Sequence, residues 1–211
     1  MLIAVDGPAA SGKGTIARSL ADHFKLPHMD TGALYRAVAL NLWRWGGDPK
    51  SEFEAVRACD DIGSNGDDPE LRSEPVSKIA SVISAYPMVR SALFERQRAF
   101  AAQPGGAVLD GRDIGTVIAP SADAKLFVTA SAQVRAQRRV RELLERGMPA
   151  RFAEVLLDLK ARDERDTGRG AAPLARADDA ALLDTSEMSV EQAVAQAVRL
   201  VEARLSERHP R

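Results

Sequence analysis

A glycine-rich turn near the N-terminus constrains the fold of this chain more than any other feature. The apolar residues 3–5 read as a short buried strand, and apolar positions at helical spacing over residues 16–24 predict a helix behind the turn. Glycines let successive backbone N–H groups point at an anion, the helix N-terminus adds partial positive charge, and a lysine adds a full one. We therefore predict a phosphate-binding loop made of Gly7, Pro8, Ala9, Ala10, Ser11, Gly12, Lys13, Gly14 and Thr15.

This loop follows the G-x-x-x-x-G-K pattern of a P-loop with one deviation. The hydroxyl residue that usually follows the lysine is replaced by Gly14, and the hydroxyl arrives one position later, at Thr15. The spelling G-K-G-T resembles the nucleoside monophosphate kinases more than the GTPases or the shikimate-type kinases. An idle glycine-rich turn is the alternative, and the strand before the loop and the helix after it argue against it.

Length and composition describe an ordinary globular chain. At 211 residues and 45% apolar content, it suits one domain with appendages and a sizeable core. The lone Cys59 cannot form an internal disulfide, and His23, His28 and His209 are too scattered to suggest a metal cluster. No signal peptide or membrane-spanning run is visible. We expect a cytoplasmic protein, acting as a monomer without a membrane partner.

The charge is balanced overall but not locally. A net charge of −1 argues against a general nucleic-acid binder, whereas nine arginines fall between Arg135 and Arg169. This local excess suggests a small polyanionic ligand. A solvated helix face is the alternative, because Glu142, Glu145 and Asp158 interleave with the arginines.

Strand and helix patterns alternate along the chain, which predicts an α/β fold. Strands are expected at 3–5, 26–30, 107–110, 124–129 and 181–184. Helices are expected at 16–24, 33–45, 51–62, 76–84, 87–100, 132–146 and 189–205, with another helix after 149 and loops at 63–75 and 167–173. This order predicts a five-stranded parallel sheet flanked by helices, with the carboxyl ends of the strands meeting at the P-loop.

Three further sets of residues could bind phosphate. A nucleoside triphosphate and a monophosphate together bring roughly six negative charges, so one lysine cannot suffice. In the first set, Thr31 lies between the end of a predicted strand and the N-terminus of the next helix, and Arg36 lies one turn further on. Together they could hold a second phosphate. Simple capping by Thr31 with a surface Arg36 explains the same pattern.

The second and third sets are denser in charge. Arg112 and Asp113 follow a buried strand, where Arg112 could bind phosphate and Asp113 could accept from a base amino group or orient the arginine. A structural Arg–Asp turn is the alternative. Arg162, Asp166 and Arg169 recur at helical spacing and would share one face that could close over phosphates, unless they form only an intrahelical ladder of salt bridges.

Taken together, these motifs resemble the bacterial cytidylate kinases over nearly the whole chain. The resemblance rests on the P-loop, on residues 30–36 and 110–117, on the arginine-bearing segments 135–139 and 162–166, and on residues 172–174 before 178–180. It implies transfer of the γ-phosphoryl group of ATP to CMP or dCMP with Mg²⁺, in pyrimidine nucleotide metabolism. It also implies a core of residues 1–46, 104–146 and 171–211, a monophosphate-binding insertion at 47–103 and a lid at 147–170.

The resemblance also implies roles for single residues. The ATP site is the P-loop, with Mg²⁺ against Thr15, and the catalytic cations are Lys13, Arg112, Arg162 and Arg169. The acceptor is held by Thr31, Arg36, Ser81, Arg90, Arg112, Asp113, Arg162 and Asp166. The chain departs from the family at 63–75, which is short and lacks the alternation of a strand, so the small antiparallel sheet of the insertion is expected to be reduced or missing.

Two other functions were weighed against this one. Another P-loop kinase could use AMP, UMP or a small metabolite, although the number of arginines favours a phosphorylated acceptor. A nucleotide-dependent switch of the GTPase kind would need an Asn-Lys-x-Asp motif to recognise guanine, and neither Asn41 nor Asn65 begins such a motif.

Overall fold

The computed structural model describes residues 1–60, 62 and 68–208 of the chain. Its strands are β1 (Leu2–Asp6), β2 (His28–Asp30), β3 (Ala107–Gly111), β4 (Ala124–Thr129) and β5 (Ala181–Asp184). Its α-helices are α1 (Lys13–Phe24), α2 (Thr31–Arg44), α3 (Glu52–Arg57), α4 (Glu74–Ile83), α5 (Pro87–Ala101), α6 (Ala132–Glu145), α7 (Phe152–Gly168) and α8 (Val190–Arg208). A 3₁₀ helix, η1 (Pro69–Arg72), and a π-helical turn, η2 (Ile114–Ile118), complete the described elements.

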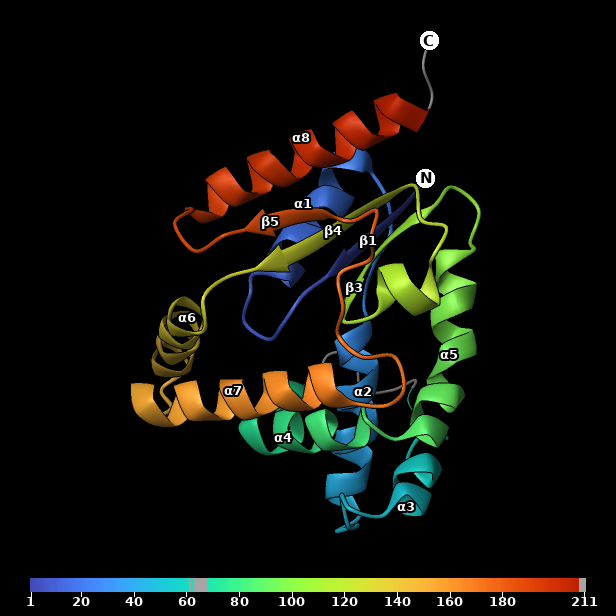
Figure 1. Ribbon diagram of the computed structural model, residues 1–211. Coiled ribbons are helices and arrows are strands. Elements are labelled where there is room, and N and C mark those ends of the chain that lie inside the picture. Colours follow the sequence, from blue (N-terminus) through green and yellow to red (C-terminus); the bar gives the residue numbers. More distant parts are fainter. Residues whose placement is uncertain (61, 63–67, 209–211) are drawn as a thin grey trace.

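The five strands form one parallel sheet in the order β2-β3-β1-β4-β5, as the sequence predicts. β1 lies at the centre, between β3 and β4, and Val5 is in register with Asp110. Because all strands run the same way, their carboxyl ends meet at one edge, where β1 leads into the P-loop (Figure 1). The loop therefore lies in the middle of this edge.

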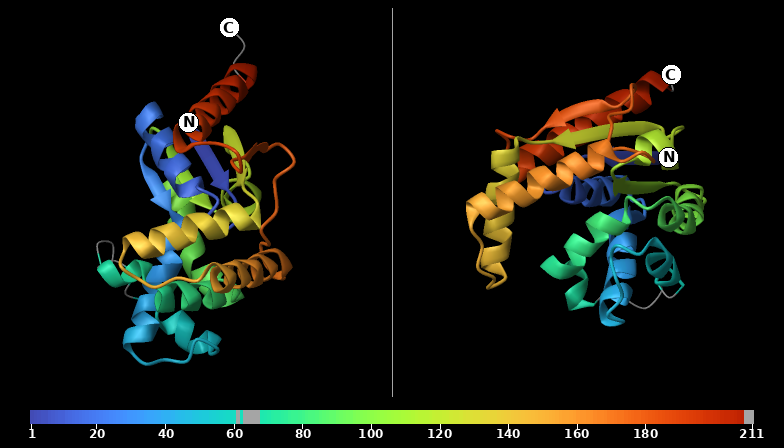
Figure 2. Two further views of the ribbon diagram at one scale, coloured as in Figure 1. Left: turned by 90° about the vertical axis from the view of Figure 1, so that its left-hand side faces the viewer. Right: turned by 60° about the horizontal axis from the view of Figure 1, so that its bottom comes forward.

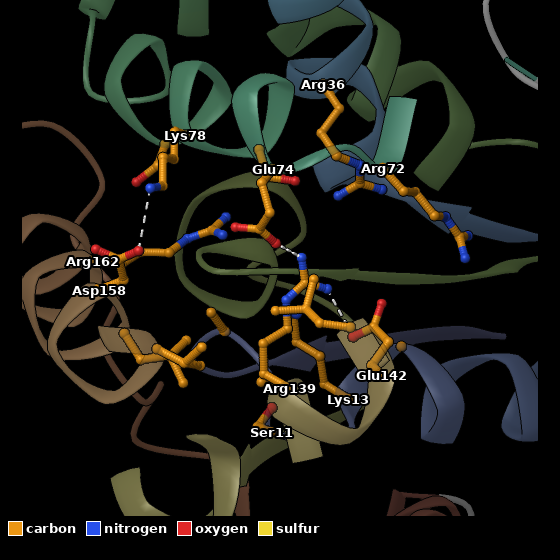
Figure 3. A pocket seen from close by; sticks show the side chains of 18 of the residues that line it. Ser11, Lys13, Arg36, Arg72, Glu74, Lys78, Arg139, Glu142, Asp158 and Arg162 are labelled. Carbon is orange, nitrogen blue, oxygen red and sulfur yellow. Dashed lines mark hydrogen bonds and ion pairs between the residues drawn. The ribbon is translucent and has the colours of Figure 1, made fainter. Parts of the chain in front are cut away.

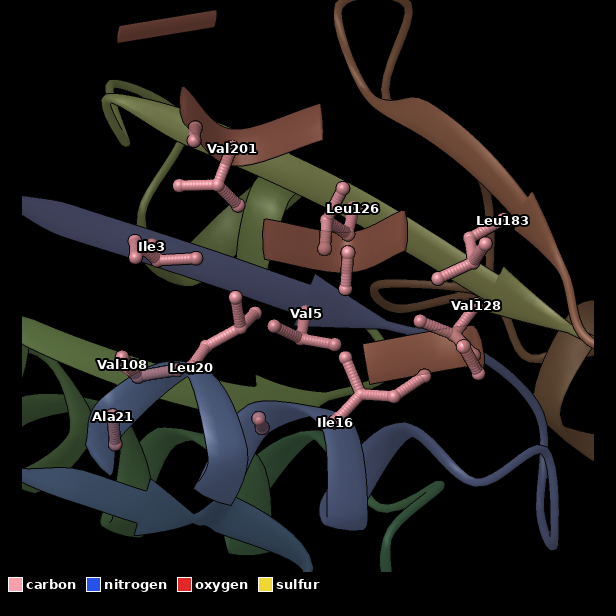
Figure 4. Close-up of a cluster of buried hydrophobic side chains, with 14 residues drawn as sticks. Ile3, Val5, Ile16, Leu20, Ala21, Val108, Leu126, Val128, Leu183 and Val201 are labelled. Atoms are coloured by element: carbon pink, nitrogen blue, oxygen red, sulfur yellow. The ribbon is translucent and has the colours of Figure 1, made fainter. Parts of the chain in front are cut away.

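Two helices cover one face of the sheet. Figure 4 shows Val5 and Leu126 from the strands packed against Leu20 of α1 and Val201 of α8, all of them buried. Ser189 begins α8 as the sequence predicts: its hydroxyl accepts from Gln192 N, and the Gln192 side chain accepts from Ser189 N. The other face is covered by α5 and η2, which pack on Leu109.

A second hydrophobic core lies beyond the carboxyl edge of the sheet. It is built from α2, α3, α4 and α5 and buries Val38, Leu42, Val76, Ile83 and Leu93 (Figures 1 and 2). Helix α2 belongs to this core, so the packing unit begins before residue 47. The assignment of 47–103 as an insertion remains a prediction.

Part of the expected secondary structure in this region is wrong. The helix expected over 51–62 ends at Arg57, and residues 61 and 63–67 lie outside the described part of the chain. Within the loop expected at 63–75, Asp68 caps η1 and the Ser73 hydroxyl caps α4, so helix begins earlier than its apolar pattern suggests. The described residues of 47–103 contain no strand, but 63–67, in the stretch where the small sheet is expected to be reduced or missing, lie outside the described residues.

Helices α6 and α7 pack on each other and extend from the sheet past the P-loop, and α7 lies beside α4 (Figures 1 and 2). Part of their contact with the loop is a small apolar cluster of Ala9, Ala136 and Leu159. Within the described residues, no helix combines the length and the apolar character needed to cross a membrane.

Candidate functional site

The P-loop is held tightly against the sheet. A Cβ added at Gly7 would lie 2.0 Å from the carbonyl oxygen of Val128, so no side chain fits there. Gly12 has a left-handed backbone (φ 86°) and begins α1, where its carbonyl accepts from the amides of Thr15 and Ile16. The following residue, Lys13, is thereby placed at the helix N-terminus, where an anion is favoured.

Arg135, which is not among the predicted site residues, holds the P-loop to α6 and α7. Arg135 of α6 donates to the Ala9 carbonyl at 3.1 Å and forms two hydrogen bonds to Asp163 of α7, the shorter at 2.6 Å. Its side chain is only 6% exposed. Arg135 therefore ties the P-loop to both helices rather than facing a ligand.

A cavity of about 580 Å³ opens above the P-loop. Residues 9–15 form its floor, and α4, α6 and α7 form its walls, with Arg36, Arg139 and Arg162 among the cations that line it (Figure 3). Thr15 also lines it. The volume lies in the range of sites for nucleotide-sized ligands.

Two ion pairs join α4 to α6 and α7 across this cavity. Arg139 of α6 pairs with Glu74 of α4 and also with Glu142 of its own helix at 2.8 Å (Figure 3). Lys78 pairs with Asp158 of α7 at 3.4 Å. The second hydrophobic core is thus linked electrostatically to α6 and α7.

A smaller cavity of about 80 Å³ lies next to the first, at the carboxyl ends of β2 and β3. Six cationic side chains and four carboxylates line it: Lys13, Arg36, Arg90, Arg112, Arg162 and Arg169, with Asp30, Asp110, Asp113 and Asp166. Positive charge is in excess, as an anionic ligand requires. The structure thereby brings together almost all the acceptor-site residues expected from the sequence.

Lys13 lies between these charges. Its Nζ is 3.9 Å from Asp110 Oδ2, and its side chain is 15% exposed. Burial and the neighbouring Arg112 lower the pKa of Lys13 to about 8. A phosphate bound here would supply negative charge and so oppose this lowering of the Lys13 pKa.

Arg112 and Arg162 converge on one carboxylate of α7. Arg112 Nε donates to Asp166 Oδ2 at 2.8 Å. Burial and then Arg112 lower the pKa of Arg162 to about 10, and its buried Nε has no hydrogen-bond partner among the described residues. An unpartnered buried guanidinium nitrogen is costly unless a ligand accepts from it.

Thr31 and Arg36 lie at the end of β2. The Thr31 hydroxyl donates to the Asp110 carbonyl at 2.8 Å, and Arg36 Nη2 donates to Asp30 Oδ2 at 2.7 Å. Asp30, and not Thr31, caps α2 through the Ala33 amide. Simple capping by Thr31 is therefore wrong, and Arg36 faces both cavities rather than the open surface.

Asp113 lies at the far end of the smaller cavity and is 6% exposed. It pairs with Arg90 of α5 and lies 4.0 Å from Arg169 Nη2. The guanidinium of Arg90 also lies 5.9 Å from the ring centre of Tyr35. This part of the cavity therefore combines an aromatic ring, two arginines and a carboxylate, which together could recognise a nucleotide base.

Two expected residues lie differently from their prediction. Arg169 does not share a helical face with Arg162 and Asp166, because α7 ends at Gly168 and Arg169 is extended (φ −67°, ψ 139°). It reaches the site by turning back, with Nε donating to the Ala172 carbonyl. Ser81 lines the larger cavity, where it accepts from Arg165 Nη2 at 3.2 Å, whereas Ser84 lines the smaller one.

The turn η2 was not expected from the sequence. Asp6, at the end of β1, accepts from the amides of Ile114 and Gly115 at 2.8 and 2.7 Å. Burial raises the pKa of Asp6 to about 7 in spite of these bonds. The carboxylate before the P-loop thereby fixes the segment that follows Arg112 and Asp113.

Other residues of the site were not assigned from the sequence either. Asp30, Asp110, Glu74, Arg139 and Arg165 line one or both cavities. The two aspartates lie at the carboxyl ends of β2 and β3 and inside the sets of candidate phosphate-binding residues, but the sequence pattern assigned them no role of their own. Glu74 carries no such signal, because its partner comes from a helix distant in the sequence.

The chain also matches known proteins in sequence. The sequence model of the cytidylate kinase family matches residues 3–203. Relatives named cytidylate kinase from Xanthobacter autotrophicus and Rhodopseudomonas palustris are 56% and 55% identical, covering 97% and 96% of this chain and 98% and 96% of their own.

Solved structures share the fold at low sequence identity. A Eubacterium ventriosum protein described as uncharacterized has a TM-score of 0.57 and 12% identity, over 96% of this chain and 99% of its own. A Thermus thermophilus protein has a TM-score of 0.50 and 20% identity, over 97% of both chains. These two support the fold alone. The match to the family model and the similarity to these relatives show that the chain belongs to the cytidylate kinase family.

Proposed function

We propose that this chain transfers the γ-phosphoryl group of ATP to CMP or dCMP, with ATP in the larger cavity and the acceptor in the smaller one. The observation that carries the proposal is that the two cavities meet. Lys13, Asp30, Arg36 and Arg162 line both. Two phosphorylated ligands seated in them would place their phosphates together, among cations that belong to both sites.

The donor is held by backbone amides and Lys13. Residues 9–15 would surround its phosphates, with α1 pointing its N-terminus at them. Mg²⁺ commonly keeps waters and phosphate oxygens with few protein ligands, so a single hard oxygen donor of the protein is enough for it to fit this site. Thr15, a hard oxygen donor lining the cavity, would hold it. The ion would neutralise charge on the phosphates.

The acceptor phosphate would be held by Arg36, Arg112 and Arg162, and the base would lie toward Arg90 and Asp113. At about 80 Å³ the smaller cavity is below the volume of a nucleotide site. Its arginines are paired with Asp30, Asp113 and Asp166. Binding therefore requires arginines to exchange carboxylates for ligand oxygens and α7 to shift as part of a lid.

Catalysis then follows from position and charge. Phosphoryl transfer needs the donor and acceptor in line and the charge on the transferring group neutralised. Lys13, Arg112, Arg162 and Arg169 would supply that charge, and no general base is needed. Both cavities are built from one chain, so we propose that the protein acts as a monomer, in the cytoplasm where its substrates occur.

A coupled assay of ADP release with ATP and each of CMP, dCMP, UMP and AMP tests the proposal. We expect release that depends on the acceptor and is fastest with CMP or dCMP. Equal rates with AMP would point to a different monophosphate kinase. Release that is the same without any acceptor would overturn the kinase proposal in favour of a nucleotide-hydrolysing switch.

A further inference from the structure

His28 lines neither cavity, but it contacts Asp110, a carboxylate of the smaller one, and the proposed mechanism does not use it. It lies on β2, in register with Val108 of β3, and its Nε2 is 2.8 Å from Asp110 Oδ1. The side chains of His28 and Asp110 are 16% and 3% exposed. An ionised carboxylate only accepts hydrogen bonds, so Nε2 is the protonated nitrogen and donates to Asp110.

The second oxygen of the same carboxylate points at the P-loop. Asp110 Oδ2 is 3.9 Å from Lys13 Nζ and 3.7 Å from the position of a Cβ on Gly14. A direct hydrogen bond from an ammonium group would be nearer about 2.8 Å. Asp110 is thus bonded firmly to the histidine and only loosely paired with the lysine.

We propose that His28 is a positioning residue for the phosphoryl donor. Its hydrogen bond holds the Asp110 carboxylate back from Lys13, so that Lys13 keeps its charge available for the phosphates of ATP. This inference rests on the proposed function of the P-loop as the ATP site.

The physical reason is that Asp110 is buried. A buried carboxylate that loses its hydrogen-bond donor must find another, since an unsatisfied buried charge is costly. Lys13 is the nearby cation, and the carboxylate would close on it. The direct ion pair would then compete with the ATP phosphates for the same ammonium group.

The test measures equilibrium binding of ATP by calorimetry, without acceptor, in His28→Leu and His28→Gln. In His28→Leu we expect the Kd for ATP to rise roughly tenfold, the size of one charge-assisted hydrogen bond. Gln can donate from a similarly placed nitrogen and should recover most of this affinity. The KM for CMP should rise less than the Kd for ATP in His28→Leu, because Asp110 itself lines the smaller cavity but the charge withdrawn from the ligands is that of Lys13, which faces the ATP phosphates.

A double-mutant cycle separates this role from a structural one. In an Asp110→Asn background the carboxylate charge is gone, so His28→Leu should no longer weaken ATP binding. His23→Leu is the matched control. His23, on α1, lies 3.3 Å from Glu202 of α8, and its side chain is 46% exposed. It should leave the ATP Kd unchanged, and melting temperatures check that each variant is folded.

The proposal is overturned if His28→Leu binds ATP as the wild type does, or if the loss persists in the Asp110→Asn background. It is also overturned if the variant raises the KM for CMP as much as the Kd for ATP. Because ATP binding is measured alone, absence of CMP phosphorylation in the wild type would overturn the proposed acceptor while this comparison would still decide the role of His28.

Discussion

Arg112 and Asp166 are 54 positions apart in the sequence, and a hydrogen bond of 2.8 Å from Arg112 Nε to Asp166 Oδ2 joins the end of β3 to α7. Burial raises the pKa of Asp166, but Arg112, Arg162 and Arg169 outweigh it and hold that pKa below its ordinary value. One carboxylate therefore partly neutralises three neighbouring cations. Asp166 stabilises the site that a ligand would later occupy.

We expect Asp166→Ala to lower the free energy of unfolding by about 3–5 kcal/mol, because it leaves buried guanidinium groups uncompensated. Urea unfolding at pH 7 measures this, and added inorganic phosphate should restore part of the loss. In the wild type the contribution of Asp166 is present above its unfolded pKa and disappears as the pH falls through its lower folded pKa. Asp22→Ala, on the exposed face of α1, should leave stability unchanged. Equal stability of the two variants would refute this role.

Asp113 is expected to discriminate cytosine from uracil. It is a buried acceptor paired with Arg90, and a cytosine amino group could donate to it where a uracil carbonyl could not. In Asp113→Ala the ratio of kcat/KM for CMP over UMP should fall by roughly tenfold or more. The control is Asp179→Ala, which removes another carboxylate paired at 2.8 Å, with Lys125, outside both cavities. An unaltered ratio in Asp113→Ala would remove Asp113 from base recognition.

Asp6 should give stability an unusual dependence on pH. Burial raises its pKa from 3.8 to about 7, so between these values the folded state retains a proton that the unfolded state has lost. Its contribution is complete below pH 3.8 and is lost as the pH rises through 7. Stability should therefore fall with a slope of up to about 1.4 kcal/mol per pH unit from this group alone.

Comparison with Asp6→Asn isolates that contribution. The free energies of unfolding of both proteins are measured from pH 4.5 to pH 7.5, and the slope of the variant is subtracted from that of the wild type. Other titrating groups then cancel. If the difference in free energy of unfolding between the two proteins stays constant over this range, Asp6 does not titrate there and is ionised throughout.

The parts of this protein that follow from the sequence have local signals. The P-loop spacing, the strand-length apolar runs and the Ser189–Gln192 cap each lie within a few consecutive residues, and each occurs as predicted. The parallel sheet follows from the order of these elements. The sequence also suggests that Arg36, Arg112 and Arg162 lie together with Lys13, as they do around the smaller cavity. Arg36 and Arg112 come shortly after the carboxyl ends of predicted strands, and Arg162 lies in the lid that the family resemblance implies.

What the sequence leaves open depends on partners far apart in the chain. The turn at Ile114–Ile118 forms because Asp6, 108 positions before Ile114, accepts its amide hydrogen. No periodicity marks such a bond. The choice of Asp166 as the partner of Arg112, and the return of Arg169 after α7 has ended, likewise depend on how elements dock.

Glu74 is expected to compete with ATP for Arg139. Arg139 lines the larger cavity and is paired with Glu74 from α4 and with Glu142 from α6. Because the Glu74 side chain is 37% exposed, the pair is partly screened by water and its loss changes binding only modestly. Glu74→Gln should lower the Kd for ATP roughly two- to fivefold at low salt, and less at high salt. The matched control is Glu154→Gln, which removes an exposed pair with Arg151 outside the cavity and should have no effect. Weaker ATP binding in Glu74→Gln would mean that the link between α4 and α6 helps to hold the nucleotide and does not compete with it.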